Sequence, residues 1–260
     1  MVDVGLCMWG CGAASNSKEH ITPDWIGNVL KELVPEGVKL HRAISRHWDA
    51  PPATPQHIHH GIGKPSGPKR KIVCDTCNKW MGRLDLRAER AMRELMLGQV
   101  PHAGKRLPGG ELLTISTWIT RMVLVFDYLQ QRPAATQKMR KRFHDERRPF
   151  DGSRVVLASH VPEQSSDAGE LAQDWPNRLS KDGREEFICH TFCYGYLVLQ
   201  VLIDVGREGT VLPPTYGYPN EFLIPIWPLA ESRQWPPDYA MRSDLLDVFG
   251  TKPTGPLNAP

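Results

Sequence analysis

The chain has 260 residues, of which 40% are hydrophobic, so it can bury the core of one large or two small domains. It contains no uncharged apolar run long enough to span a membrane, and no secretory signal precedes the first cysteine, so we expect a cytoplasmic protein with reduced thiols. The net charge of +3 is unevenly placed: residues 1–150 hold 24 Lys and Arg against 14 Asp and Glu, whereas residues 151–260 hold 8 against 15. A basic front of this kind is typical of proteins that contact polyphosphates.

The first cysteine pair lies near the start of the chain. Three residues separate Cys7 from Cys11, and glycines on either side of Cys11 permit the tight turn that a metal-binding knuckle needs. We expect a strand to lead from this knuckle to Glu19 and His20, an acid followed directly by an imidazole.

The next segment connects the first cysteine pair to a second one. Apolar residues recur at helical spacing in residues 24–34 and predict a short helix. Residues 38–48 alternate well enough for a strand, whereas residues 49–68 are rich in Pro, Gly and His, have no period and predict a loop. A last strand is expected at residues 71–73.

The second cysteine pair begins the strongest predicted helix. Cys74 and Cys77 have the tight two-residue spacing, and Asn78 follows them directly. Residues 78–97 place their apolar side chains on one face, which predicts an amphipathic helix. Asp85 lies two turns into this helix, and we expect it to have a structural or salt-bridging role.

The two pairs together predict a structural zinc site. Tetrahedral zinc takes four thiolate or imidazole ligands, usually as two close pairs far apart in sequence. The ligands would be Cys7, Cys11, Cys74 and Cys77. Buried or free thiols are one alternative. Two disulfides are another, which a reducing compartment disfavours.

Two motifs resemble a known family. They are Ser-Lys-Glu-His-Ile-Thr-Pro at residues 17–23 and Cys-Asp-Thr-Cys-Asn-Lys-Trp-Met-Gly-Arg-Leu-Asp at residues 74–85. They are similar to the HNH endonucleases of the ββα-metal type, in the bacterial and phage subgroup with a Glu-His start and a CxxCN helix. The resemblance covers residues 7–97. It implies that His20 activates water as the general base, that Glu19 and Asn78 hold a catalytic Mg²⁺ or Mn²⁺ ion, and that the four cysteines hold structural Zn²⁺.

One position departs from that family. Its central asparagine usually lies a few residues before the second cysteine pair, and residues 67–73 contain no asparagine. The residue that orients His20 is therefore not identified. His57, His59 and His60 in the preceding loop are candidates.

The remainder of the chain predicts helices and then strands. A turn region at residues 99–110 marks a boundary, and the helix at 111–131 should be largely buried because apolar residues recur at intervals of three and four. A basic helix is expected at 134–148. The back third is predicted to contain strands at 153–161, 186–205 (two strands meeting at 194–196) and 221–227, with a long loop at 163–182. Pro225 indicates that the last strand is an edge strand.

Two other features of the sequence bear on function. Cys189, His190 and Cys193 have no second close cysteine pair, so we interpret them as core thiols and an ordinary histidine. Two groups of basic residues are candidate phosphate contacts, although a solvated charged surface is the alternative for both. These residues are Lys69, Arg70, Lys71, Lys138, Arg140, Lys141 and Arg142.

The sequence therefore predicts an α+β protein. A zinc-stapled ββα-metal (HNH) module at residues 1–100 would precede a domain with helices and an antiparallel β-rich part at 101–250 and a disordered tail at 251–260. The predicted function is a metal-dependent endonuclease that hydrolyses phosphodiester bonds of nucleic acid, with DNA favoured. The alternative is a non-catalytic zinc-binding module that binds nucleic acid or a protein partner, such as a phage or bacterial conflict protein. No membrane partner is expected, and the sequence does not predict the oligomeric state.

Overall fold

The computed structural model contains both helices and antiparallel strands, so the predicted α+β class is confirmed. No helix in the described part of the chain is both long and apolar enough to cross a membrane. The structure describes residues 5–33, 43–45, 57–59, 69–100, 104–162, 172–181, 184–210, 221–228 and 231–251.

The front of the molecule is a strand pair followed by a long helix. Its elements are β1 (Ser17–His20), α1 (Asp24–Leu30), the 3₁₀ turn η1 (Lys31–Leu33), β4 (Lys69–Val73) and α2 (Asp75–Met96). β1 and β4 pair antiparallel, with Glu19 opposite Arg70 and His20 opposite Lys69. The strands and helices predicted at these positions are confirmed, and α2 begins three residues earlier than the sequence pattern indicated.

The middle layer is formed by α3 (Gly109–Tyr128) and α4 (Gln137–Glu146). α3 is buried on most sides because α2 covers one side and strands of the large sheet cover another. Thr136 caps the N-terminus of α4, because its hydroxyl accepts a hydrogen bond from the Met139 N–H at 3.2 Å. Arg147 caps the C-terminus in a left-handed backbone conformation.

The back of the molecule is a five-stranded antiparallel sheet with the order β10-β6-β9-β8-β7. Its strands are β6 (Ser153–Ser159), β7 (Ala172–Lys181), β8 (Arg184–Tyr194), β9 (Leu197–Asp204) and β10 (Ile224–Trp227). Alternate residues of β6 face opposite sides. Val155 and Leu157 join the core that includes α3, whereas Val156 packs with residues of α5 (Ser243–Thr251). β10 ends the sheet, so the predicted edge position of Pro225 is confirmed.

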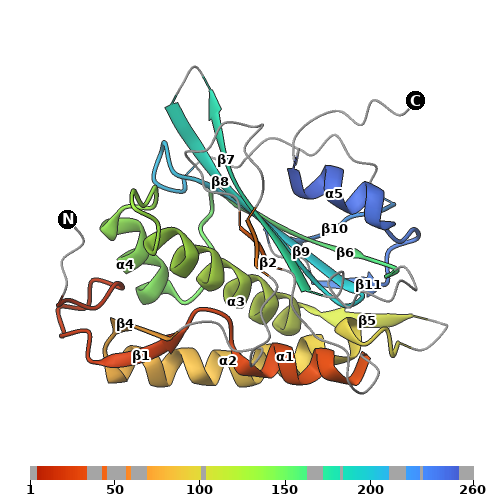
Figure 1. Ribbon diagram of the computed structural model, residues 1–260, viewed down its shortest axis with the longest axis horizontal. Helices are drawn as coiled ribbons and strands as arrows, with labels where there is room; N and C mark the ends of the chain where they lie inside the picture. Colours follow the sequence, from red (N-terminus) through yellow and green to blue (C-terminus); the bar gives the residue numbers. More distant parts are fainter. Residues whose placement is uncertain are drawn as a thin grey trace.

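Figure 1 shows these layers in order, with α1 and α2 on one side, α3 and α4 in the middle and the large sheet on the other side. One hydrophobic core connects them. It contains Trp9 and Val73 from the front, Ile115 and Phe143 from the middle layer and Leu199 from the sheet. Residues on both sides of position 100 therefore share a core.

Three strands lie where the sequence pattern predicted loops or turns. β3 (His57–His59) pairs with β2 (Ala43–Ser45), β5 (Lys105–Pro108) pairs with β11 (Ser232–Trp235), and β7 is an edge of the large sheet. The predictions of a loop or turn at these positions were wrong. Short polar segments with proline lack the apolar alternation of a half-buried strand, and their hydrogen bonds depend on partners distant in sequence. Beyond these elements, most of the loops predicted at 49–68 and 163–182, much of the strand predicted at 38–48 and the tail after residue 251 lie outside the described residues.

The turn between β8 and β9 ties the sheet to the end of α2. The Tyr196 N–H donates a hydrogen bond of 3.0 Å to the carbonyl oxygen of Met96. Gly195 has a φ of +62°, and a Cβ added there would lie 2.3 Å from the same oxygen. Only glycine allows this approach.

Candidate metal centre and acid–histidine site

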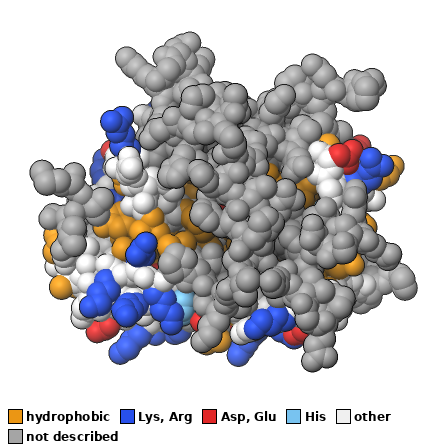
Figure 2. Space-filling view, in the orientation of Figure 1, with side chains coloured by type: hydrophobic (Ala, Val, Ile, Leu, Met, Phe, Trp, Pro, Cys, Tyr) orange, Lys and Arg blue, Asp and Glu red, His pale blue; other side chains and the backbone are white. Residues whose placement is uncertain are grey.

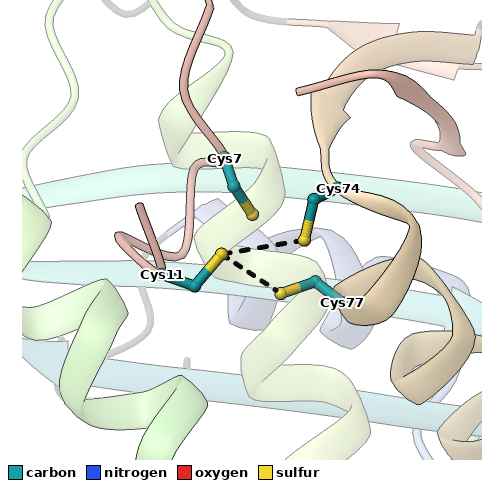
Figure 3. Close-up of side chains that lie close together, drawn as sticks. All are labelled: Cys7, Cys11, Cys74 and Cys77. Atoms are coloured by element: carbon teal, nitrogen blue, oxygen red, sulfur yellow. Dashed lines mark hydrogen bonds between the residues drawn. The ribbon is translucent and has the colours of Figure 1, made fainter. Parts of the chain in front are cut away.

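Four cysteines from two distant segments come together at the start of α2 (Figure 3). The Sγ atoms of Cys7, Cys11, Cys74 and Cys77 all lie within 4.8 Å of one another. Cys11 Sγ is 3.7 Å from Cys74 Sγ and 3.8 Å from Cys77 Sγ. A tetrahedron of thiolates around zinc, with Zn–S bonds of about 2.3 Å, has edges of about 3.8 Å. The four side chains therefore fit a metal ion such as Zn²⁺.

The loop that carries the first pair is held against β4. The Met8 N–H donates a hydrogen bond of 2.8 Å to the carbonyl oxygen of Ile72. Gly10 and Gly12 have φ values of +66° and +81°, a region that glycine enters without strain. The glycines thus make the tight turn that the sequence predicted.

The second pair lies at the N-terminus of α2, where Cys74 is the N-cap and Cys77 is in the first turn. Free backbone N–H groups and the positive end of the helix dipole favour thiolates at this position. Burial acts in the opposite direction: it raises the pKa of Cys7 to about 11 and also raises the pKa of Cys77. Such thiols lose their protons as they bind a cation, so we expect metal binding to release protons.

α4 closes one side of the metal centre. His144 Nε2 lies 3.2 Å from Cys77 Sγ, and the His144 ring meets the Trp80 ring edge-on with centroids 5.6 Å apart. The Arg147 guanidinium lies 3.9 Å from the Trp80 centroid. The sequence predicted this helix only as a basic segment, and His144 was not among the predicted site residues. The one available signal was its place next to Phe143, on the apolar face of the helix.

Glu19 points into the protein from β1 and meets Arg121 of α3. Arg121 Nη1 lies 2.9 Å from Glu19 Oε1, and Nη2 lies 2.8 Å from Asp85 Oδ1. The Trp118 Nε1–H donates to the same Asp85 oxygen at 2.8 Å. The salt-bridging role predicted for Asp85 is confirmed. Arg121 itself was missed, although a charged residue inside an apolar helix signals a buried partner.

This cluster contains two carboxylates but one guanidinium. Arg121 has a side-chain exposure of 0% and Glu19 of 5%. Burial raises the pKa of Glu19 to about 7, an effect that Arg121 opposes and Asp85 reinforces. Within the part of the chain that the structure describes, the second Glu19 oxygen, Oε2, forms no hydrogen bond.

His20 follows Glu19 at the end of β1, and its side chain is 28% exposed. Its Nε2 lies 3.3 Å from Asp24 Oδ2, which is an ion-pair distance without the alignment of a hydrogen bond. Asp24 is thus the carboxylate that contacts His20 among the described residues. The sequence had left the orienting residue unidentified. The side chains of His57 and His59, and all of His60, lie outside the description.

Asn78 lies in the first turn of α2 and faces β1. Its Nδ2 donates a hydrogen bond of 2.8 Å to Ser17 Oγ. Two residues further along β1, Glu19 reaches Asp85 of the same helix through Arg121. Asn78 and Glu19 therefore both lie where β1 faces α2, a contact that we call the seam between β1 and α2. Among the described residues, the four cysteines form the one close cluster of three or more His, Cys, Asp and Glu ligand atoms.

The basic residues at 69–71 are free of ion pairs in the described part of the chain. All three are exposed on β4. The outer face of α2 adds four more exposed cations without an ion pair there: Lys79, Arg83, Arg87 and Arg90. Figure 2 shows Lys and Arg side chains gathered along one edge of this view, over β1, β4 and α2.

The basic residues of α4 already have partners. Lys138 pairs with Glu208 at 2.6 Å, and Lys141 and Arg142 pair with acids one turn further along the helix. Arg140 is buried and donates hydrogen bonds to the carbonyl oxygens of Met8 and Ala135. The structure therefore places Arg140 away from the surface that was predicted to meet phosphate.

Cys189, His190 and Cys193 are buried in β8, as predicted. His190 Nε2 lies 3.2 Å from Asp174 Oδ2, and its ring stacks on Phe192.

Comparisons of the chain with models of protein families, with curated proteins and with solved structures found no match. We therefore infer function from the chemistry of the site.

Proposed function

We propose that this protein is a metal-dependent endonuclease of the HNH type, which hydrolyses phosphodiester bonds of nucleic acid, with DNA favoured. The observation that carries the proposal is the seam between β1 and α2. Glu19 and Asn78 lie along it, His20 follows Glu19 at the end of β1, and the four-cysteine centre holds the start of α2. A metal ion in that centre would be structural, because four thiolates leave no open coordination position.

His20 is the proposed general base. An imidazole accepts a proton near neutral pH. The His20 side chain is partly exposed, but its Nε2 is buried against Asp24, so Nδ1 is the nitrogen proposed to take the proton from water. Removal of the proton from the attacking water creates an imidazolium. The Asp24 carboxylate lies 3.3 Å from Nε2 of the same ring. We assign to Asp24 the role of orienting His20, for which residues 67–73 contain no asparagine.

Glu19 and Asn78 are the proposed ligands of the Mg²⁺ or Mn²⁺ ion. Carboxylate and amide oxygens are the donors that these hard cations prefer, and such ions commonly use one or two protein ligands together with water and substrate phosphate. The ion supplies stabilisation of the charge on the phosphate and on the leaving oxygen. Glu19 would offer Oε2, since Oε1 is bound to Arg121.

The exposed cations of β4 and α2, which form no ion pair with any described residue, support nucleic acid as the substrate. Exposed Lys and Arg side chains without carboxylate partners attract phosphates and release counterions when they bind them. Lys69 and Lys71 lie opposite His20 and Lys18 in the β1–β4 pair, so this positive surface borders the proposed general base.

Cleavage of supercoiled plasmid tests the proposal. The unchanged protein should cut in the presence of added Mg²⁺ or Mn²⁺ and should stop when these ions are removed by dialysis, which leaves the zinc in place. His20→Ala should lower the rate by about 10²–10⁴-fold, with unchanged zinc content and circular dichroism. Cleavage that survives in His20→Ala would place the base elsewhere. Asp24→Asn should give a smaller loss.

A non-catalytic zinc module is the second candidate. It is favoured by the position of Arg121, whose guanidinium already lies between Glu19 and Asp85 and supplies them with a positive charge. In that case the protein would bind nucleic acid or a protein partner without turnover. Binding of labelled DNA with no cleavage in Mn²⁺ would support this candidate over the nuclease.

A further inference from the structure

We infer that Arg121 is a positioning residue for Glu19: it holds one carboxylate oxygen inside the protein and leaves the other for a divalent cation. The inference rests on the proposed function, because it takes Glu19 as a ligand of that cation. α3, which lies outside the β1–β4–α2 unit, thereby contributes a residue to the site.

The Arg121 guanidinium is held at both ends. Arg121 donates to Glu19 from Nη1 at 2.9 Å and to Asp85 from Nη2 at 2.8 Å, and its side chain is fully buried. A planar guanidinium that is bound at both ends cannot rotate without breaking one of the two bonds. The direction of the Glu19 carboxylate is therefore set jointly by α2 and α3.

Side chains from α1 and α3 hold the Asp85 end of this guanidinium contact in place. The Trp118 Nε1–H donates to the Asp85 oxygen that accepts from Arg121. The Trp118 ring also packs against Trp25 of α1, with centroids 5.5 Å apart. α1 begins at Asp24, the residue that contacts His20. One network thus supports the Glu19–His20 pair from α1, α2 and α3.

The charges of the Glu19–Arg121–Asp85 cluster do not balance. Arg121 carries one positive charge, whereas the cluster has two carboxylates, Glu19 and Asp85. Buried charge without compensation is costly. Within the described residues no second cation meets Glu19, and its Oε2 atom forms no hydrogen bond. A divalent cation at Oε2 would supply the missing positive charge.

The test measures Mn²⁺ binding to the zinc-loaded full chain from the electron paramagnetic resonance signal of free Mn²⁺. Loss of a residue that supports a metal ligand typically weakens metal binding by about 10–100-fold. We expect a loss of about that size in Arg121→Met. Arg121→Lys keeps the positive charge but loses the pair of nitrogens that bind Glu19 and Asp85 at once, so it should recover part of the affinity. Glu19→Gln should remove the same binding.

Arg140→Met is the matched control. Arg140 is also a buried arginine, but it bonds backbone carbonyl oxygens away from Glu19. This variant should bind Mn²⁺ like the unchanged protein, even if it is less stable. If Arg121→Met does not fold, the double variant Arg121→Met with Asp85→Asn removes one charge of each sign and takes its place, with the same weak binding expected.

Equal Mn²⁺ affinity in the Arg121 variants and in Arg140→Met would overturn the inference, and so would an unchanged protein that binds no Mn²⁺. Plasmid cleavage by the same samples separates this from the proposed function. Arg121-dependent Mn²⁺ binding without cleavage rejects the nuclease and retains the positioning role. If the protein cleaves plasmid but its Mn²⁺ affinity does not depend on Arg121, the nuclease proposal stands and the positioning role of Arg121 is rejected.

Discussion

The cations of α2 and those of α4 should contribute unequally to nucleic-acid binding. Arg83 and Arg87 are exposed on α2 and have no ion pair among the described residues. Lys138 and Lys141 are exposed on α4, but each pairs with an acid. The double variants Arg83→Gln/Arg87→Gln and Lys138→Gln/Lys141→Gln change the net charge equally, so they form a matched comparison of position and partner.

The expected magnitude follows from counterion release. Each cation that neutralises a phosphate of duplex DNA contributes about 0.9 to the slope of log affinity against log salt concentration. Loss of both α2 arginines should therefore reduce the slope by up to about 1.8. Loss of the α4 lysines should change it less, because the carboxylates of Glu208 and Asp145 beside them repel phosphates.

Fluorescence anisotropy with a short labelled duplex at several salt concentrations measures these slopes. The variants are made in a His20→Ala background, so that cleavage does not consume the duplex. The reasoning is refuted if the α4 pair reduces the slope as much as the α2 pair does. Equal affinities of both variants and the parent at every salt concentration would refute it too, because the duplex would then contact neither helix.

Three other expectations concern the metal, the fold and pH. Cys77→Ser should lower the zinc content below one ion per chain by mass spectrometry and reduce the urea midpoint, because metal affinity contributes to folding free energy; full zinc content would argue against the four-cysteine site. Gly195→Ala should lower the unfolding free energy by at least about 1 kcal/mol because of its positive φ and its contact with Met96, whereas Gly82→Ala in α2, where a Cβ meets nothing within 4 Å, should raise it by about 0.5–1 kcal/mol. Burial raises the pKa of Glu19 from 4.5 to about 7, so ionisation of Glu19 should cost the folded state up to about 3 kcal/mol as the pH rises through that interval. In urea titrations without added divalent ions, the stability of Glu19→Gln relative to the unchanged protein should therefore increase from pH 4.5 to 7, and a flat difference would contradict this assignment.

Local patterns predicted the elements whose stability depends on nearby residues. The apolar stripe of α2 and the long apolar run of α3 predicted both helices, because helix formation and the buried face are set by residues three and four positions apart. The apolar β8–β9 segment predicted a strand pair with its turn at Gly195. The polar edge strand β7 and the short strand β5 were missed, because their hydrogen bonds depend on partners that sequence pattern does not reveal.

Cysteine spacing by itself predicted the four-cysteine cluster, since two close pairs of thiols far apart in sequence are the pattern of a tetrahedral metal site. The sequence also placed Glu19, His20 and Asn78 as candidate site residues. Only the tertiary structure decided what surrounds them: Arg121 reaches Glu19 from a helix about a hundred positions away, and His144 reaches Cys77 from α4. Buried polar groups must find partners, but which partners they find depends on how the layers pack, and no local pattern encodes that packing.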